Sequence, residues 1–253
     1  MRKLLQYLNM AWAAVLVPTV FIGIATPLTL IAFPLPLRAR LWWVGPFWKL
    51  FALSVIRGAC WASVHVEDHR QPELRTRPPQ GLYISNHQSY LDIPLMLTQY
   101  QVLPIMKKEI LYIPIFGLVA WVAGAMVVSR GHRGSRKKVF VQARKRLVTD
   151  RFSLQYYPEG TRSKDGHPRP LDDIKANLIQ VAFDAGVPVV PISMWGTSQV
   201  LNQTGIIHPG RRLGIITHRA RLPQDYADAE SFIAACWADV TEGHARLERT
   251  LQS

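Results

Sequence analysis

The side chains with the clearest chemical potential lie in the stretch YISNHQSYLDIP, where an apolar run ends in a polar turn. This turn carries His87 and, five positions later, Asp92. Along one continuous helix, five residues correspond to about 140° of rotation, so the two side chains would not share a face. They can meet if His87 lies in the turn before a helix and Asp92 in its first turns. The carboxylate would then fix the imidazole tautomer and leave the other nitrogen free to take a proton; the alternative is a helix cap beside a surface histidine.

A second polar group follows another strand-like run, in the stretch QYYPEGTRSKDGHPRP. Its short loop contains Glu159, Gly160, Thr161, Arg162 and Lys164. A glycine beside a hydroxyl and an arginine can form a phosphate cradle, because it offers exposed backbone N–H groups, a donor side chain and a bidentate guanidinium. The alternative, a polar β-turn, would require neither the Pro–Glu pair nor the cluster of cations.

Short β-branched or aromatic runs alternate with helical stretches over the part of the chain that carries these residues. The predicted strands are 81–86, 101–106, 125–129, 152–157, 187–194 and 212–218. The predicted helices lie near 90–99, 110–122, 135–149, 172–185 and 229–251. Such alternation favours an α/β domain, with a central, mostly parallel sheet flanked by helices. Before it, the polar and proline-rich stretch 67–80 is typical of a linker or an exposed loop.

The N-terminal part of the chain is apolar, with no charged side chain from Leu4 to Leu37. A run this long exceeds the apolar region of a signal peptide, about 7–15 residues, and is long enough to cross a bilayer. Prolines interrupt it, and the next apolar stretch is rich in tryptophan, as in an interfacial belt. We therefore expect a membrane-embedded pair of helices in residues 1–64, such as a hairpin that dips in and returns, and an α/β domain in residues 65–253.

One later segment, residues 110–128, is also uncharged and long enough for a transmembrane helix. Pro114, Gly117 and Gly124 interrupt it. A buried helix that leads into a buried strand, or a surface that faces the membrane, explains the segment at least as well.

The composition narrows the classes of function. With 30 Lys and Arg against 17 Asp and Glu, the formal net charge is +13, which implies an anionic partner such as nucleic acid or a phosphate-rich membrane surface. The basic stretch 130–151 lacks interleaved exposed aromatic residues and any known reader motif, so we expect no nucleic acid. Cys60 and Cys236 are isolated, which argues against a zinc site, a redox motif or a disulfide framework and favours core positions. We predict neither a metal nor a cofactor.

Taken together, NHQSYLD and YPEGTRS resemble the motifs of the glycerolipid acyltransferase family, which includes 1-acylglycerol-3-phosphate acyltransferases. The resemblance extends from residue 81 to about 195, in the order of the family's motifs. NHQSYLD is similar to the family's histidine–four residues–aspartate motif, with His87 and Asp92. The stretch KKEILYIPIFG…GAMVVSR is similar to the second block and ends in Arg130. YPEGTRS and VPVVPI are similar to the glutamate–glycine and proline blocks.

The resemblance implies transfer of a fatty acyl group from a thioester, on coenzyme A or an acyl-carrier protein, to a glycerolipid hydroxyl, with lysophosphatidic acid as acceptor. His87 would deprotonate the hydroxyl for direct attack on the thioester carbon, and Asp92 would orient His87. A covalent acyl-enzyme is not required, because the sequence has no G-x-S-x-G elbow and no candidate nucleophilic cysteine. The acceptor's phosphate and glycerol would be held by Arg130, Glu159, Gly160, Thr161 and Arg162, with Lys108 a weaker candidate.

Some alternatives stay open. Family members commonly carry an aromatic–Lys–x–Gly run after the third block, whereas this chain has DIKANL, which leaves the acceptor undecided between lysophosphatidic acid, another lysolipid and glycerol-3-phosphate. A non-catalytic membrane-surface protein of the same fold is a further reading, disfavoured by the intact motifs. The basic stretch 130–151 fits a patch that binds anionic membrane lipids, a docking face for an acidic carrier, or a solvated helix face. Lys and Arg flank the first apolar run at both ends, which suits a re-entrant hairpin or a two-pass pair of helices. In both cases we expect the basic body on the cytoplasmic face of the membrane, where thioester donors are made.

Overall fold

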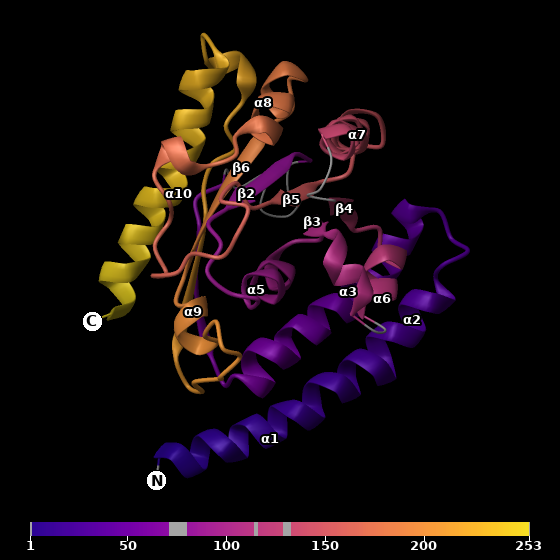
Figure 1. Cartoon of the computed structure of the whole chain (residues 1–253), viewed down its shortest axis with the longest axis vertical. Coiled ribbons are helices and arrows are strands. Elements are labelled where there is room, and N and C mark those ends of the chain that lie inside the picture. The colour runs from indigo at the N-terminus through magenta and orange to yellow at the C-terminus, as the bar shows by residue number, and fades with distance from the viewer. Residues whose placement is uncertain (1, 71–79, 114–115, 129–132, 253) are drawn as a thin grey trace.

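The computed structural model describes residues 2–70, 80–113, 116–128 and 133–252. A central sheet of seven strands in the order β1-β7-β6-β2-β5-β3-β4 forms its core (Figure 1). The strands are β1 (Ser63–Asp68), β2 (Leu82–Ser85), β3 (Leu103–Lys107), β4 (Met126–Val128), β5 (Leu154–Tyr156), β6 (Val189–Trp195) and β7 (Arg212–Thr217). The predicted α/β class with a central sheet is confirmed.

The sheet is parallel except at one junction. β6 pairs with β7 in antiparallel orientation, and β7 pairs with β1 in parallel, so β1 and β7 run opposite to the other described strands. The linker or loop predicted for residues 67–80 is wrong at its start, because Glu67 and Asp68 are the last two residues of β1. β1 is an edge strand with partly exposed side chains, so it tolerates polar residues that an apolar pattern would miss. Residues 71–79 lie outside the described chain.

Helices cover both faces of the sheet (Figure 1). They are α5 (Asp92–Gln99), α6 (Phe116–Val122), α7 (Arg133–Arg144), α8 (Asn177–Asp184), the short α9 (Thr197–Val200) and α10 (Ala229–Gln252). Shorter turns of helix are η3 (Lys108–Tyr112), η4 (Lys145–Thr149), η5 (Leu171–Asp173) and η6 (Pro223–Asp225). Helices α7, α8 and α10 pack on one face and α5 on the other, as the two main clusters of buried residues indicate.

The strand β2 illustrates why the sheet is buried on both sides. All of its residues are buried, and its side chains alternate between the two cores. Leu82 and Ile84 join the cluster under α8 and α10, whereas Tyr83 joins the cluster under α5. Because side chains of a strand alternate with period two, an uninterrupted apolar run such as this one fits a parallel strand covered on both faces.

The N-terminal segment forms a helical hairpin. Its elements are α1 (Arg2–Val20), η1 (Phe21–Ala25), α2 (Thr26–Ile31), α3 (Leu37–Leu53) and η2 (Ser54–Ala59). Two hydrogen bonds join α1 to η2, at the end of the hairpin away from its turn. Asn9 Nδ2 donates to the carbonyl of Ala59 at 2.8 Å, and Trp12 Nε1 donates to that of Gly58 at 2.9 Å. The continuous helical stretch Leu4–Ile31 has a mean hydropathy of 2.1 and, within the described part of the chain, is the helix long and apolar enough to cross a membrane.

The turn of the hairpin is held by one arginine. Arg40, in the first turns of α3, donates to the carbonyls of Phe33 at 2.6 Å and Leu35 at 2.9 Å. Its other terminal nitrogen donates to the carbonyl of Val122, at the end of α6, at 2.5 Å. These bonds satisfy carbonyl groups that a turn leaves without helical partners. Arg40 therefore joins the hairpin to the α/β part of the chain.

The segment 110–128 is not one helix in its described parts. It contains the end of η3, the short helix α6 and the strand β4, which pairs with β3. Val119 and Val122 are buried, while Leu118 and Trp121 are more than half exposed. The segment therefore combines a helix that leads into a strand with apolar side chains that are exposed. Helix α6 lies beside α2 of the hairpin (Figure 1).

The topology brings the two polar motifs to one edge of the sheet. Strands β5, β2 and β6 are adjacent and parallel, so their carboxyl ends meet at that edge. His87 follows β2, Glu159 follows β5, and Thr197 follows β6. Loops at the carboxyl ends of parallel strands are the usual place for a binding site in an α/β sheet.

The turn from β6 into α9 gives a stability test. Gly196 has φ +85°, and a Cβ there would lie 2.7 Å from the carbonyl oxygen of Arg212. Gly196→Ala should therefore lower the free energy of unfolding by about 3 kcal/mol or more, through backbone strain and this clash together.

The matched control for this test is Gly186, which has φ +64° but no atom within 4 Å of the position that a Cβ would take. Gly186→Ala should cost only about 1–2 kcal/mol, because it introduces backbone strain without a clash. Urea unfolding in detergent measures both variants, and equal losses would contradict the close approach of β7 to Gly196.

Candidate active site

His87 and Asp92 meet just beyond the carboxyl end of β2. Asp92 is the first residue of α5, and its Oδ2 lies 2.6 Å from the Nδ1 atom of His87. Asp92 is fully buried, whereas the His87 side chain is 16% exposed, so the pair joins the core to the surface. With Nδ1 donating to the carboxylate, the tautomer leaves Nε2 able to accept a proton. The structure thus brings these two predicted residues together in the turn-then-helix arrangement.

The Asp92 carboxylate has further donors. Its Oδ2 also accepts from the backbone N–H groups of Gln88 at 2.7 Å and Ser89 at 2.9 Å. Its Oδ1 accepts from the hydroxyl of Thr197 at 2.5 Å. Such a set of donors satisfies the hydrogen-bonding capacity of a buried carboxylate. Thr197 escaped the sequence analysis because it lies 105 positions from Asp92 and belongs to no motif.

Glu159 links the second motif to the first. Its Oε1 accepts from the backbone N–H of His87 at 2.8 Å, and the backbone N–H of Ser163 donates to the carbonyl of His87 at 2.7 Å. Both peptide groups beside the imidazole are therefore held by the loop that follows β5. The glutamate thus acts on the backbone of the histidine, while Asp92 acts on its ring.

The Glu159 carboxyl is buried, with an exposed fraction of 2%. Its Oε2 has no hydrogen-bond partner among the described residues, and the Nε of Arg169 lies 3.9 Å away. Burial raises the pKa of Glu159 to about 7, although the His87 backbone N–H and the charge of Arg169 oppose this rise. The carboxyl therefore changes its charge near neutral pH.

Tyr157 provides the surface on which His87 rests. The two rings are stacked with centroids 4.1 Å apart and an interplanar angle of 24°. The Tyr157 hydroxyl accepts from Nε2 of Gln155 at 2.6 Å, and burial raises the pKa of Tyr157. Stacking and the Asp92 hydrogen bond together restrict the imidazole to one plane. Tyr157 stands inside the YPEGTRS motif, but only the pairing of β2 with β5 places it against the histidine.

Two further predicted residues have defined surroundings. Gly160 has φ +67°, and a Cβ there would come within 2.8 Å of the Nζ of Lys175, so Lys175 lies over this glycine. Arg162 is half-buried, with its guanidinium carbon 4.0 Å from the centroid of the Tyr90 ring, a cation–π contact. Lys175 belongs to the DIKANL segment that departs from the family pattern, yet it still reaches the glutamate–glycine loop.

Two other predicted residues, Thr161 and Lys108, are exposed. Thr161 lies at the tip of the loop, and Lys108 lies at the start of η3. Arg130 lies outside the described residues.

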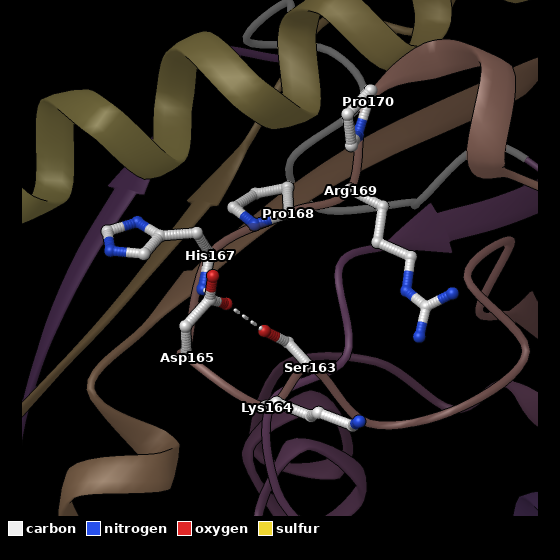
Figure 2. Close-up of a pocket in the computed structure, with 7 residues that line it drawn as sticks. All are labelled: Ser163, Lys164, Asp165, His167, Pro168, Arg169 and Pro170. Atoms are coloured by element: carbon white, nitrogen blue, oxygen red, sulfur yellow. Dashed lines mark hydrogen bonds between the residues drawn. The ribbon is translucent and has the colours of Figure 1, made fainter.

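The loop continues into a pocket that the sequence analysis missed. Figure 2 shows its lining, which consists of Ser163, Lys164, Asp165, His167, Pro168, Arg169 and Pro170. The side chains of Lys164 and Arg169 extend to the same side of the loop. Trp237, buried on α10, donates from Nε1 to the carbonyl of Arg169 at 2.9 Å and so anchors the loop to the core.

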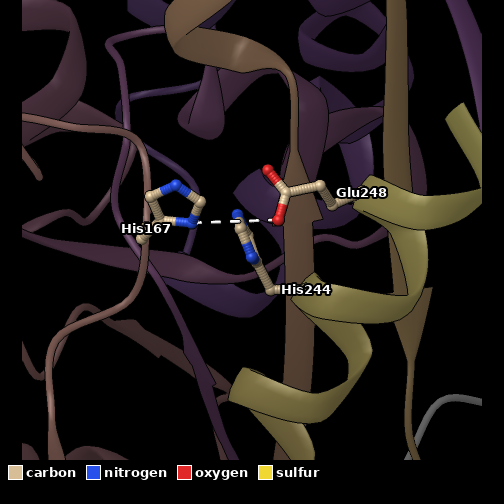
Figure 3. A group of neighbouring side chains, drawn as sticks. All are labelled: His167, His244 and Glu248. Carbon is tan, nitrogen blue, oxygen red and sulfur yellow. Dashed lines mark ion pairs between the residues drawn. The ribbon is translucent and has the colours of Figure 1, made fainter. Parts of the chain in front are cut away.

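A group of three side chains ties the same loop to α10 (Figure 3). His167, His244 and Glu248 offer ligand atoms within 4.8 Å of one another, and His167 Nδ1 lies 3.9 Å from Glu248 Oε2. The Nε2 of His244 is already engaged, since it lies 2.9 Å from Gln88 Nε2 and 3.1 Å from the carbonyl of Gly166. This engaged nitrogen makes the group a structural brace behind the site, and we assign no metal to it.

Comparison with known proteins agrees with the geometry. The family model described as "Acyltransferase" matches residues 65–195. Curated relatives are 1-acyl-sn-glycerol-3-phosphate acyltransferases. That of Haemophilus influenzae is 29% identical over 63% of this chain and 61% of its own length, and that of Escherichia coli is 31% identical over 53% and 54%. The human alpha form is 35% identical over 46% of this chain and 42% of its own. The chain thus spans about half the length of the curated relatives it matches.

A solved structure has the same fold over almost the whole chain. It is described as the 1-acyl-sn-glycerophosphate (LPA) acyltransferase, PlsC, from Thermotoga maritima, with a TM-score of 0.80, 23% identity, and coverage of 98% of both chains. At this identity the likeness establishes the fold, including the helices that precede the sheet.

The family model covers more than half of the chain, and it spans both the His87–Asp92 pair and the Glu159–Arg162 loop. This protein therefore belongs to the acyltransferase family.

Proposed function

We propose that this protein transfers a fatty acyl group from an acyl thioester to the sn-2 hydroxyl of 1-acylglycerol-3-phosphate, giving phosphatidic acid. The observation that carries the proposal is the 2.6 Å contact between His87 Nδ1 and Asp92 Oδ2, at the sheet edge from which the glutamate–glycine loop also starts. The names of the relatives point to the same reaction. The donor is a thioester of coenzyme A or of an acyl-carrier protein.

In this mechanism His87 Nε2 takes the proton of the acceptor hydroxyl as its oxygen attacks the thioester carbon. Asp92 stabilises the imidazolium that forms and keeps Nδ1 protonated. The tetrahedral intermediate collapses, the carbon–sulfur bond breaks, and the proton passes to the departing thiolate. Tyr157 and the backbone contacts from Glu159 and Ser163 keep the imidazole in place during these steps.

Cations around the loop suit an acceptor that carries a phosphate. We propose that Arg162, together with Arg130 and the backbone at Gly160 and Thr161, binds this phosphate and the glycerol, and that Glu159 supports the binding loop. Lys175 lies over Gly160 and adds a positive charge at the same place. An arginine can bind a phosphate through two parallel hydrogen bonds, which also orients the hydroxyl toward the base.

The N-terminal hairpin would keep the site at a lipid surface. Large apolar side chains are exposed along it, among them Leu8, Val15, Ile31, Trp42 and Trp43. We propose that the hairpin within residues 1–64 anchors the protein in the membrane. The α/β domain, whose predicted start is residue 65 and whose strand β1 begins at Ser63, would lie on the cytoplasmic side, where thioester donors are made. In this arrangement the lysolipid acceptor reaches the site without leaving the bilayer.

The direct test is acyl transfer by the purified protein in detergent or vesicles. Lysophosphatidate should be acylated by a coenzyme A or carrier-protein thioester, and each donor is supplied separately. Preference for glycerol-3-phosphate or for another lysolipid would replace the proposed acceptor but keep the chemistry. Absence of transfer to all acceptors from both donors would refute the function.

Among the predictions from the proposed function, the first concerns the base. His87→Ala should reduce kcat by about 10²–10⁴-fold, because the acceptor hydroxyl loses the group that takes its proton. His208→Ala, which removes a histidine on a loop outside the site, is the control and should keep wild-type activity. Circular dichroism establishes that both variants fold, and near-normal turnover by a folded His87→Ala enzyme would rule out the mechanism.

The second prediction concerns Glu159. A carboxyl whose pKa is about 7 in the folded chain and 4.5 when unfolded favours the native state below pH 4.5, and this stability is lost as the pH rises to about 7. The loss is on the order of 3 kcal/mol. Glu159→Gln cannot ionise, so the unfolding free energy of the variant, relative to wild type, should rise between pH 5 and about pH 8. A parallel pH dependence of the two proteins in urea titrations would contradict the buried, weakly paired state of this carboxyl.

The third prediction concerns the membrane. Trp42 and Trp43 on α3 are 75% and 49% exposed, whereas Trp237 on α10 is 2% exposed. Lipids with brominated acyl chains should quench part of the tryptophan fluorescence, and this part should shrink in Trp42→Phe and Trp43→Phe. Trp237→Phe is the matched control and should leave the quenched part unchanged. An equal quenched part of the fluorescence in all three variants would show that α3 does not contact the acyl chains.

A further inference from the structure

The two oxygens of the Asp92 carboxylate have different partners. Oδ2 lies against the His87 imidazole and two backbone N–H groups. Oδ1 accepts a hydrogen bond from the hydroxyl of Thr197, which is its donor among the described residues. The carboxylate is completely buried, so water does not replace a donor that is removed. The orientation of Asp92 therefore depends on donors at both oxygens.

Thr197 is held where its hydroxyl faces the carboxylate. It is completely buried and starts the short helix α9, directly after Gly196 turns the chain out of β6. Its hydroxyl has one proton and two neighbouring acceptors, Asp92 Oδ1 at 2.5 Å and Gln88 Oε1 at 3.1 Å. The shorter contact to the charged acceptor takes the proton, because hydrogen bonds to ionised groups are the stronger ones.

From these contacts we propose that Thr197 is a positioning residue, whose hydroxyl holds the Asp92 carboxylate in the rotation that directs Oδ2 toward His87. The proposal rests on the proposed function for its effect on turnover. Rotation about the bond to a carboxylate is soft, so without a donor at Oδ1 the carboxylate can turn and misalign the imidazole. Thr197 lies two positions beyond the segment that the family model matches, and it is supplied by a different strand from either motif.

Two substitutions separate the hydroxyl from the methyl group of Thr197. Thr197→Val keeps the shape and removes the hydroxyl, and Thr197→Ser keeps the hydroxyl and removes a methyl group. We expect kcat to fall by about 10- to 100-fold in Thr197→Val with KM nearly unchanged, because alignment and not substrate binding is lost. Thr197→Ser should stay within about threefold of wild type, since the hydrogen bond remains.

Thr98→Val is the matched control. Thr98 is a buried threonine of α5 whose hydroxyl donates to the carbonyl of Leu95 at 2.6 Å, without contact to Asp92. The Thr98→Val variant should be less stable than wild type, but its kcat should not fall as that of Thr197→Val does. Wild-type kcat in Thr197→Val would overturn the proposal. A greater loss of kcat in Thr197→Ser than in Thr197→Val would also overturn it, because the residue would then act through the packing of its methyl group.

A spectroscopic readout keeps this test independent of turnover. The proton between His87 Nδ1 and Asp92 should give a low-field NMR signal that is absent in His87→Ala. The signal should persist in Thr197→Ser and shift or disappear in Thr197→Val. If the wild-type protein transfers no acyl group, the proposed function fails while this signal still tests the positioning. A signal that is identical in Thr197→Val and wild type would overturn the positioning role.

Discussion

A buried carboxylate must be surrounded by hydrogen-bond donors, and the loops at one edge of the sheet are organised around that requirement at Asp92. The donors come from the turn after β2 and from the first residue of α9. Each lies there because β2 and β6 are adjacent and parallel and end at the same edge. The α/β sheet thus supplies a buried carboxylate with hydrogen-bond donors from residues that are far apart in the sequence.

The second motif acts on the same histidine from the other side. Glu159 and Ser163 bind the peptide groups of His87, and Tyr157 covers its ring. The loop itself is fixed from behind, where Trp237 and His244 of α10 contact its backbone. The two motifs are therefore one unit, and the C-terminal helix belongs to its support. This explains why a helix at the end of the chain carries a buried tryptophan and histidine on its inner face.

The apolar strands were predictable, because β2 and β6 are buried on both faces and read as continuous apolar runs. β1 was missed because an edge strand tolerates polar residues, and the reversed direction of β7 has no signature in local sequence. The His87–Asp92 pair could be anticipated from its spacing together with the resemblance to the family's motifs. Thr197 could not, because its role depends on which strands are neighbours. Lys175 lies in a segment that departs from the family pattern, yet its side chain still lies over Gly160. A departure from the motif therefore does not remove a side chain from the site.

The pairing of β1 with β7 has a consequence for how the chain is made. β1 directly follows the apolar hairpin, and its partner is the last strand of the sheet, about 150 residues later. During synthesis the hairpin and β1 emerge before β7. With the hairpin anchored as proposed, β1 would wait at the lipid surface until β7 has followed. Closing so long a loop is slow, and an unpaired strand edge invites aggregation in the meantime. Attachment of the nascent chain to a bilayer would keep such edges apart, so the proposed anchor would protect folding as well as bring the site to its proposed acceptor.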